Sequence, residues 1–171
     1  MNSKNKIIAV VVLSFVFSAI PATEVEANSR SLDIVTEDDV VPFEVRIACD
    51  LWGEIYDICP EFLEAIAFHE SRFVQDAENG TCIGVMQVNT AAHQKRIEKL
   101  GVTDICDINS NVMVAADYLA ELFDEYDDPA VVLGYYHGEK NAKRRAESGI
   151  LSPYVRAILE KSEELERAHG K

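Results

Sequence analysis

The chain has 171 residues, which is the length of a single domain, and its formal net charge is −14 at pH 7. So acidic a chain binds nucleic acid poorly and is repelled by an anionic membrane surface. We therefore expect no nucleic-acid partner and interpret the charge as a source of solubility, with the protein a monomer.

Residues 1–27 have the pattern of a secretory signal peptide. Two lysines precede an uncharged run over residues 7–20, and Val25 and Ala27 are small residues at the positions that a signal peptidase recognises. A membrane anchor is the alternative, but the run is short for a span of about 20 residues. We expect cleavage after Ala27, export from the cytoplasm and no stable membrane insertion afterwards.

A flexible lead-in and a first helix are expected next. Residues 28–42 are polar and acidic with little periodicity, whereas residues 43–57 have helical periodicity. The inward stripe of this helix is predicted to consist of Val45, Ala48, Trp52 and Ile55.

A second helix is predicted from Pro60 to Glu70. Proline fits the first turn of a helix, because it lacks an N–H group that would be unpaired there. Residues at helical spacing form one apolar face, on which Glu70 is the acid and from which Glu61 and Glu64 mostly diverge. The members of that face are Leu63, Ile66, Ala67 and Glu70.

Glu70 is the first candidate for a catalytic residue. A carboxyl group that a helix carries toward the core is poorly solvated, and desolvation raises its pKa. A carboxyl group that stays protonated near neutral pH can donate its proton to a leaving oxygen. Periodicity alone leaves open the alternative that this glutamate ends the helix and points into solvent.

Residues 73–89 lack helical periodicity, and we expect a small irregular or β-hairpin segment there. The segment contains Gly80 and Gly84, and it closes with a tight turn that ends in the amide of Asn89.

Five more helices are expected, so the fold class is mainly α with one core. Thr90 is predicted to cap a helix that ends at Leu100, and Ser110 a longer one. Asp128 and Pro129 open a short helix through Tyr136, a basic helix covers residues 141–148, and Ser152 with Pro153 begins the last one. The inward residues of the longer and last helices are Val112, Ala116, Leu119, Phe123, Tyr154, Ile158 and Leu165.

The four cysteines follow the proposed signal peptide. An even number in an exported protein predicts two disulfides with three possible connectivities. We favour Cys59–Cys82, which would join the start of the second helix to the loop before Gly84, and this leaves Cys49–Cys106. Zinc is the rival interpretation, but no Cys-x-x-Cys pair or histidine at zinc spacing is present, so no metal site is expected.

Five motifs occur in an order that is similar to a known family. They are Glu70-Ser71-x-Phe73, Gly84-x-Met86-Gln87, Asn111-Val112 followed by Tyr118-Leu119, Tyr135-x-x-Gly138, and Tyr154-Val155. Over residues 43–165 the chain resembles the catalytic domain of the soluble lytic transglycosylases, which has a lysozyme-like α fold. The resemblance implies a catalytic domain over residues 43–171 and a place of action at the cell wall.

The resemblance also implies roles for single residues. Glu70 matches the catalytic acid and base of the family, and Ser71 follows it as in the family pattern. The residues that would contact the glycan are Ser71, Met86, Gln87, Asn89, Tyr135 and Tyr154. The chain departs from the family at Tyr136, where the Tyr-Asn-x-Gly motif has its asparagine. Tyr136 or the next residue, His137, would take over the hydrogen bond of that asparagine, or both pack.

The implied substrate is peptidoglycan, cut between N-acetylmuramic acid and N-acetylglucosamine. Glu70 would act as acid and then as base while the C6 hydroxyl of the muramic acid closes a 1,6-anhydro ring, so no cofactor and no second acid are needed. A muramidase on the same fold would need a second carboxylate. Asp76, Glu78 and Asp107 are the candidates for it, and we favour the view that they are solvated loop charges. A catalytically silent glycan-binding module is the third possibility, because of Tyr136.

Overall fold

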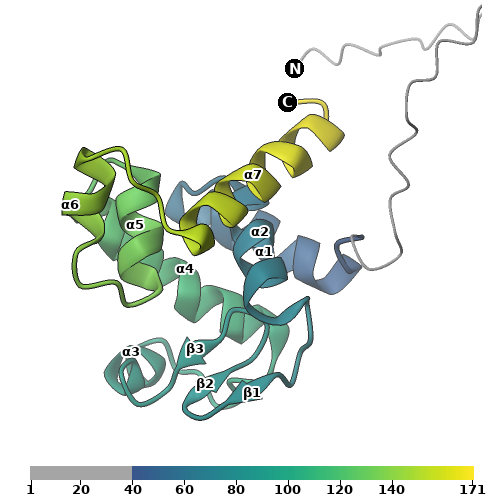
Figure 1. Ribbon diagram of the computed structural model, residues 1–171. Helices are drawn as coiled ribbons and strands as arrows, with labels where there is room; N and C mark the ends of the chain where they lie inside the picture. Colours follow the sequence, from purple (N-terminus) through teal and green to yellow (C-terminus); the bar gives the residue numbers. More distant parts are fainter. Residues whose placement is uncertain (1–39) are drawn as a thin grey trace, which may run out of the picture. The chain divides into compact units, whose positions relative to one another are not determined.

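The computed structural model describes residues 40–171 (Figure 1). The predicted signal peptide, its cleavage site after Ala27 and all but the last three residues of the predicted lead-in lie outside the described residues. The elements in chain order are α1 (Phe43–Tyr56), α2 (Pro60–Ser71), β1 (Glu78–Asn79), β2 (Cys82–Ile83), β3 (Val88–Asn89), α3 (Gln94–Lys99), α4 (Ile108–Glu125), α5 (Pro129–Tyr136), α6 (Ala142–Glu147) and α7 (Pro153–Ala168). The prediction of a mainly α fold with a small β segment is confirmed.

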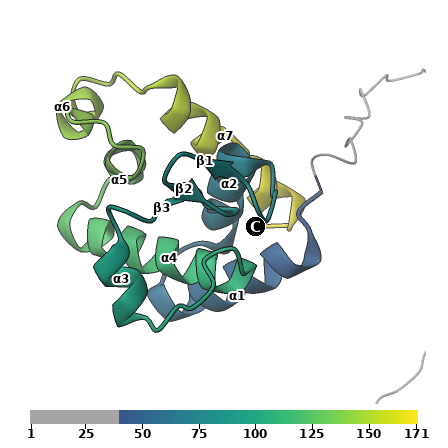
Figure 2. The same cartoon turned by 90° about the horizontal axis from the view of Figure 1, so that it is seen from below.

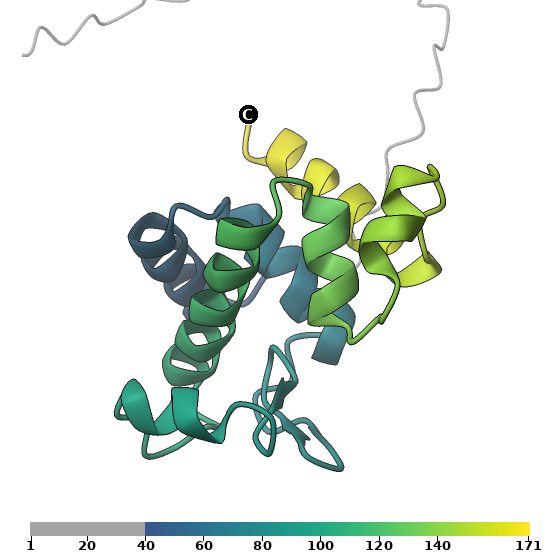
Figure 3. The same cartoon turned by 90° about the vertical axis from the view of Figure 1, so that its left-hand side faces the viewer.

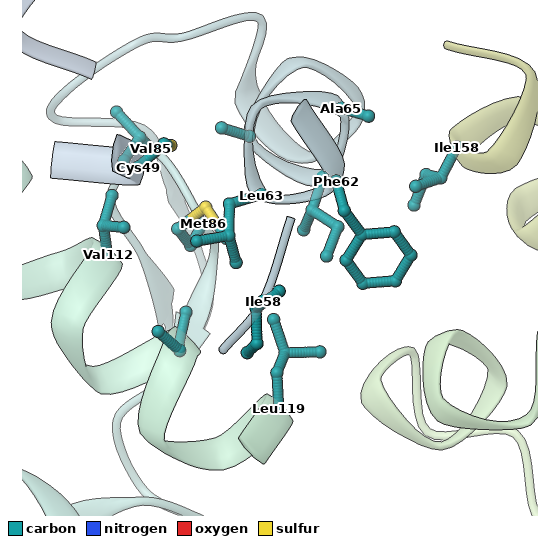
Figure 4. Close-up of a cluster of buried hydrophobic side chains, with 14 of the residues drawn as sticks. Cys49, Ile58, Phe62, Leu63, Ala65, Val85, Met86, Val112, Leu119 and Ile158 are labelled. Carbon is teal, nitrogen blue, oxygen red and sulfur yellow. The ribbon is translucent and has the colours of Figure 1, made fainter. Parts of the chain in front are cut away.

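Helix α2 lies at the centre of the packing. It contacts α1 on one side and α7 on another, while α1 also packs on α4, and α5 contacts α4, α6 and α7 (Figure 1). Leu63 of α2, Met86 of the loop before β3 and Val112 of α4 meet in one apolar cluster (Figure 4). The large apolar side chains that are fully buried include Leu63, Ile66, Met86, Leu119, Leu133 and Ile158.

Two glutamates of α2 are buried, which corrects the expectation that they diverge from the core. Glu61 is 2% exposed and Glu64 is 1% exposed, because α1 and α7 both pack on α2 and cover faces that the single apolar stripe left unassigned. Glu61 binds His169 and Lys171 at the end of the chain, at 2.8 Å each. Arg46 lies 4.0 Å from Glu64, and one oxygen of Glu64 has no hydrogen-bond partner.

The helix caps show where local sequence decides the ends of helices. Asp128 and Ser152 cap α5 and α7 as predicted, with their side chains accepting from the backbone N–H groups of Ala130 and Val155. The cap of α4 is Asp107 and not Ser110, whose backbone N–H donates to the Asp107 carboxylate.

The start of α3 and the inward face of α1 also differ from the prediction. Helix α3 begins only at Gln94, because Thr90 pairs with the Thr81 carbonyl in the preceding loop. Ile55 is 56% exposed, whereas Val45 and Ala48 of the same expected stripe are buried.

The three strands form an antiparallel sheet in the order β1-β2-β3. Glu78 pairs with Ile83 across the first pair, and Ile83 pairs with Val88 across the second. The sheet lies at one end of the described part of the chain, next to the C-terminal end of α2 (Figures 1 and 3). The turn after β2 is therefore brought beside Glu70.

The predicted disulfides are absent, because all four cysteines have free thiols. The favoured Cys59–Cys82 pair is wrong for a geometric reason. Cys59 is the N-cap residue of α2, whereas Cys82 lies in the cleft near Glu70 at the other end of that helix. Eleven residues of helix separate Cys59 from Glu70, which is about 16 Å at 1.5 Å per residue. Cys49 is buried in the core and is not bonded to Cys106.

Within residues 40–171, no helix combines the length and the apolar character that crossing a membrane requires.

Candidate active site

A cleft with a volume of about 420 Å³ lies between the small sheet, α4 and the C-terminal end of α5. Its lining residues are Glu70, Asn79, Cys82, Gln87, Val88, Asn89, Ala92, His93, Val114, Ala115, Tyr118, Tyr135, Tyr136, His137 and Gly138. Glu70 is the one carboxylic acid among these lining residues. The cleft therefore combines a single acid with several aromatic and amide side chains.

The helix α2 delivers Glu70 to this cleft from its last turn. Arg72 ends the helix in the left-handed conformation with φ 54°, so the chain turns away just beyond Glu70. The hydroxyl of Tyr154 donates a hydrogen bond to Glu70 Oε1 at 2.6 Å. Burial raises the pKa of Glu70, and this effect outweighs the hydrogen bond from Tyr154 and the charge of His137, which both act to lower it.

Two histidine rings hold Tyr154 in place. His137 stacks on the Tyr154 ring with a centroid distance of 3.8 Å and an angle of 16°, and His69 meets it edge-on at 4.8 Å. Burial raises the pKa of Tyr154, with the charge of Glu70 acting in the same direction. Tyr154 therefore remains a neutral donor that points at the acid.

The turn facing Glu70 is fixed by a buried amide of α4. Asn111 Oδ1 accepts from the Met86 N–H at 2.8 Å, and its Nδ2 donates to the carbonyls of Ile83 and Ile105 at 2.9 Å each. Gly84 has φ +81°, and a Cβ there would lie 2.2 Å from Asn111 Nδ2. Only glycine leaves room for this contact, so Gly84 and Asn111 are fitted to each other.

The two predicted amides, Gln87 and Asn89, line the cleft. Gln87 has φ 48°, and its Nε2 donates to the carbonyls of Ala77 and Gly84 at 3.0 Å each. Asn89 Oδ1 accepts from the Ala92 N–H at 3.0 Å. Each amide thus stabilises the loop while it faces the cleft.

Ser71 and Met86 are not at the cleft surface, which corrects the expectation that they contact the glycan. Met86 is fully buried in the core. The Ser71 hydroxyl donates to the Val85 carbonyl at 2.8 Å. Both residues pack between the turn and α2, on the side away from the cleft. The spacing of the motif alone does not distinguish such a packing role from contact with the glycan.

The neighbouring residues Tyr135 and Tyr136 have different contacts. Tyr135 lines the cleft and stacks on Tyr126, with a centroid distance of 4.8 Å. Tyr136 stands where the resemblance expects an asparagine, and its hydroxyl donates to the Met86 carbonyl at 2.7 Å. Burial raises the pKa of Tyr136, so its hydroxyl stays a neutral donor. The departure from the motif thus leaves a hydrogen-bonding residue at this position.

An aromatic wall of the cleft was not predicted from the sequence. His93 contacts Tyr118 with a ring distance of 4.4 Å, and both line the cleft with His137. Tyr118 lies seven residues after Asn111, so the two share a face of α4. That spacing is the signal that would have found Tyr118, whereas His93 follows an irregular loop and has no periodic signal.

The three candidates for a second acid are exposed and lie outside the cleft lining. They are Asp76, Glu78 and Asp107. The Asp107 carboxylate already accepts the Ser110 N–H as the cap of α4. Among the described residues, no group of three or more histidine, cysteine and acidic side chains is arranged to hold a metal ion.

A helical domain with one acid at the end of a central helix, beside a small sheet, defines a lysozyme-like fold. A family model described as the transglycosylase SLT domain matches residues 48–150, which is more than half of the chain. The protein belongs to the transglycosylase SLT domain family.

One solved structure supports the fold assignment. An inactive mutant of the lytic transglycosylase Slt from Pseudomonas aeruginosa has 16% sequence identity and a TM-score of 0.65. The match covers 76% of this chain and 25% of that enzyme, so the chain spans about a quarter of its length. A comparison with curated proteins finds no match.

Proposed function

We propose that the protein is a peptidoglycan lytic transglycosylase that cleaves the β-1,4 bond between N-acetylmuramic acid and N-acetylglucosamine. The observation that carries the proposal is Glu70, the single carboxylic acid of the cleft lining, with its pKa raised by burial and its carboxylate held by Tyr154. Membership of the transglycosylase family supports the substrate class.

The mechanism uses Glu70 twice. Protonated Glu70 gives its proton to the glycosidic oxygen, the bond from that oxygen to C1 of the muramic acid breaks, and C1 becomes oxocarbenium-like. The ionised Glu70 then takes the proton of the C6 hydroxyl while that oxygen bonds to C1. The product is a 1,6-anhydro ring, Glu70 is protonated again, and no water is consumed.

The tyrosine that contacts Glu70 suits this alternation. The hydrogen bond from Tyr154 stabilises the ionised form of Glu70, whereas burial stabilises the protonated form. The two influences oppose each other, and burial is the stronger, so the pKa of Glu70 is raised. A group that must donate and then accept a proton works best with its pKa near the working pH.

A hydrolytic muramidase is the alternative on this fold, and the positions of Asp76, Glu78 and Asp107 outside the cleft lining argue against it. Mass spectrometry of digested peptidoglycan in ¹⁸O-labelled water separates the two. We expect fragments without a reducing end, lighter by one water than muramidase products and free of label. Label in reducing-end muramic acid would establish hydrolysis instead.

Three matched variants test whether any acid besides Glu70 takes part in the reaction. Asp76→Asn, Glu78→Gln and Asp107→Asn are each expected to keep most of the turnover, because none of these groups is needed as a nucleophile or base. Collapse of turnover in one folded variant would identify a partner carboxylate. Absence of any turnover in the unaltered protein would favour a glycan-binding module.

The site of action is part of the proposal. We infer that residues 1–27 direct export and that the mature chain begins at Asn28, acts on the cell wall and is monomeric. The run of uncharged residues after Lys4 and Lys6 supports the export signal. Amino-terminal sequencing of the protein recovered outside the cytoplasm tests this, and an intact first residue there would contradict it.

A further inference from the structure

Helix α1 carries a second apolar stripe that faces away from the core. Its inner side, with Val45, Ala48 and Cys49, is buried against α2 and α4. Its outer side presents four large apolar side chains that remain exposed. They are Phe43 at 72%, Ile47 at 49%, Leu51 at 43% and Ile55 at 56%. We call these four residues the outer stripe.

The spacing of the outer stripe is that of a continuous ridge. Each residue follows the previous one by four positions, so the side chains lie one above another along the helix. The ridge runs over the twelve residue steps from Phe43 to Ile55, or roughly 18 Å at 1.5 Å per residue. Contiguous exposed apolar surface of this kind marks interaction sites more often than scattered single residues do.

Acidic side chains accompany the ridge. Glu44, Asp50 and Glu54 are exposed, and their helical positions place them among or beside the apolar residues. Arg46 is the one basic residue of α1; it is also exposed and lies 4.0 Å from Glu64 of α2, so these three exposed acids outnumber the one base of the helix. The outer stripe is therefore an apolar ridge within negative charge.

Charge decides between the possible occupants. A second copy of the chain would bring the same acids against themselves. Residues 28–39 carry four acids and one arginine, so they are not complementary either. An anionic membrane would be repelled by a protein of net charge −14.

We propose that the outer stripe binds an amphipathic helix of another protein, with apolar residues on the contacting face and basic residues beside them. Helices dock in this way through anchors at helical spacing. The outer stripe shares no residue with the cleft lining, and α1 lies beside α4 and away from α5 and α6 (Figure 2). Such a partner would hold the protein at a site while the cleft stays open.

The test uses the whole protein and two synthetic helices about 18 residues long, which is enough to cover the ridge. Both carry leucines every four residues, one with lysines beside them and the other with glutamates. Fluorescence anisotropy is expected to show one-to-one binding of the lysine peptide and much weaker binding of the glutamate peptide. In Ile47→Ser/Leu51→Ser the affinity for the lysine peptide should fall roughly tenfold or more, because the burial of two large apolar side chains is lost.

A matched pair of variants controls for exposed apolar residues in general. Val74→Ser/Ile150→Ser alters two exposed residues outside α1 and the cleft, and its affinity should be unchanged. Asp50→Asn/Glu54→Gln should weaken binding several-fold and reduce its dependence on salt. Thermal unfolding and peptidoglycan turnover should be unaffected by the Ile47 and Leu51 changes, so a failure of the catalytic proposal is seen separately.

Several results would overturn the inference. Equal binding of both peptides, or binding that Ile47→Ser/Leu51→Ser leaves intact, would show that the ridge does not select a basic helix. Self-association that these substitutions abolish would show that a second copy covers it. No binding, together with loss of thermal stability in the variant, would show that the chain covers the ridge itself.

Discussion

At the N-terminal end of α2 two glutamates are buried in the protein interior, whereas at its C-terminal end Glu70 opens onto the cleft. Burial would raise the pKa of Glu61, but hydrogen bonds from Cys59, Lys171 and His169 lower it to about 2. Burial raises the pKa of Glu64 to about 7, with the charges of His169 and Arg46 opposing it. Burial also raises the pKa of Glu70 against one hydrogen bond.

The comparison separates two conditions that a catalytic acid must meet. Glu64 and Glu70 both hold their protons more tightly than a free glutamate does, yet only Glu70 lines a cleft that a substrate can enter. Glu61 shows that the number of donors decides the direction of the shift. A raised pKa on this helix therefore identifies a desolvated acid, and access to the cleft distinguishes Glu70 as the acid that we propose to be catalytic.

The largest expected effect is that of Glu70→Gln. The substitution keeps the shape and removes the titratable proton, and acid–base catalysis contributes ~10²–10⁴-fold to a single step. Because one group serves both steps, we expect turnover of purified peptidoglycan to fall by about three orders of magnitude or more. Glu64→Gln is the matched control, with the same change on the same helix and most of its turnover kept. Retention of more than about a tenth of the turnover in Glu70→Gln would remove Glu70 from the mechanism.

Glu64→Gln should also change how stability depends on pH. The pKa of Glu64 rises from 4.5 in the free side chain to about 7 in the folded protein, so the folded state binds the proton more tightly. Its contribution to the free energy of unfolding is complete below pH 4.5 and is lost as the pH rises through 7, by about 3 kcal/mol at most. Relative to the unaltered protein, the glutamine variant should gain stability between pH 5 and pH 8. Urea unfolding of both proteins at the two pH values checks this, and a constant difference would contradict it.

Tyr154→Phe should produce a smaller loss at the other end of α2. The substitution removes the hydrogen bond that lowers the pKa of Glu70, so that pKa rises further. A hydrogen bond to a charged group contributes about 1.5–3 kcal/mol, so we expect turnover to fall about tenfold to a hundredfold. The high-pH limb of the kcat/KM profile, where Glu70 loses its proton, should move to higher pH. A profile that keeps its position would show that Tyr154 only packs against the acid.

The sequence was most informative where local chemistry determines structure. Asp128-Pro129 and Ser152-Pro153 place a cap and a first-turn proline side by side, and the two helices begin there. The single apolar face with Glu70 was also correct as far as it went. Periodicity describes one face at a time, however, so it did not reveal that Glu61 and Glu64 are buried where α1 and α7 pack on α2, or that the outer stripe of α1 stays exposed.

Residues near the cleft were harder to assign, because their roles depend on contacts between distant segments. Ser71 and Met86 stand in the motif beside Glu70 and Gln87, yet they pack behind the turn. Asn111 lies in a motif that marked only the family, although its side chain fixes the turn. The disulfide prediction rested on the even number of cysteines and on a proposed link between the second helix and the loop before Gly84. The length of α2 separates Cys59 from Cys82, so this link does not form.

The small sheet is held from one side only, and this leaves the other side adjustable. Asn111 and Tyr136 secure the turn after β2 through Met86, whereas Gly80, at the tip between β1 and β2, has open space around it. The tip can lengthen or change its side chains while the acid stays where it is. Under the proposed function, changes at this tip would alter how much of the glycan the domain contacts and would leave Glu70 in its place.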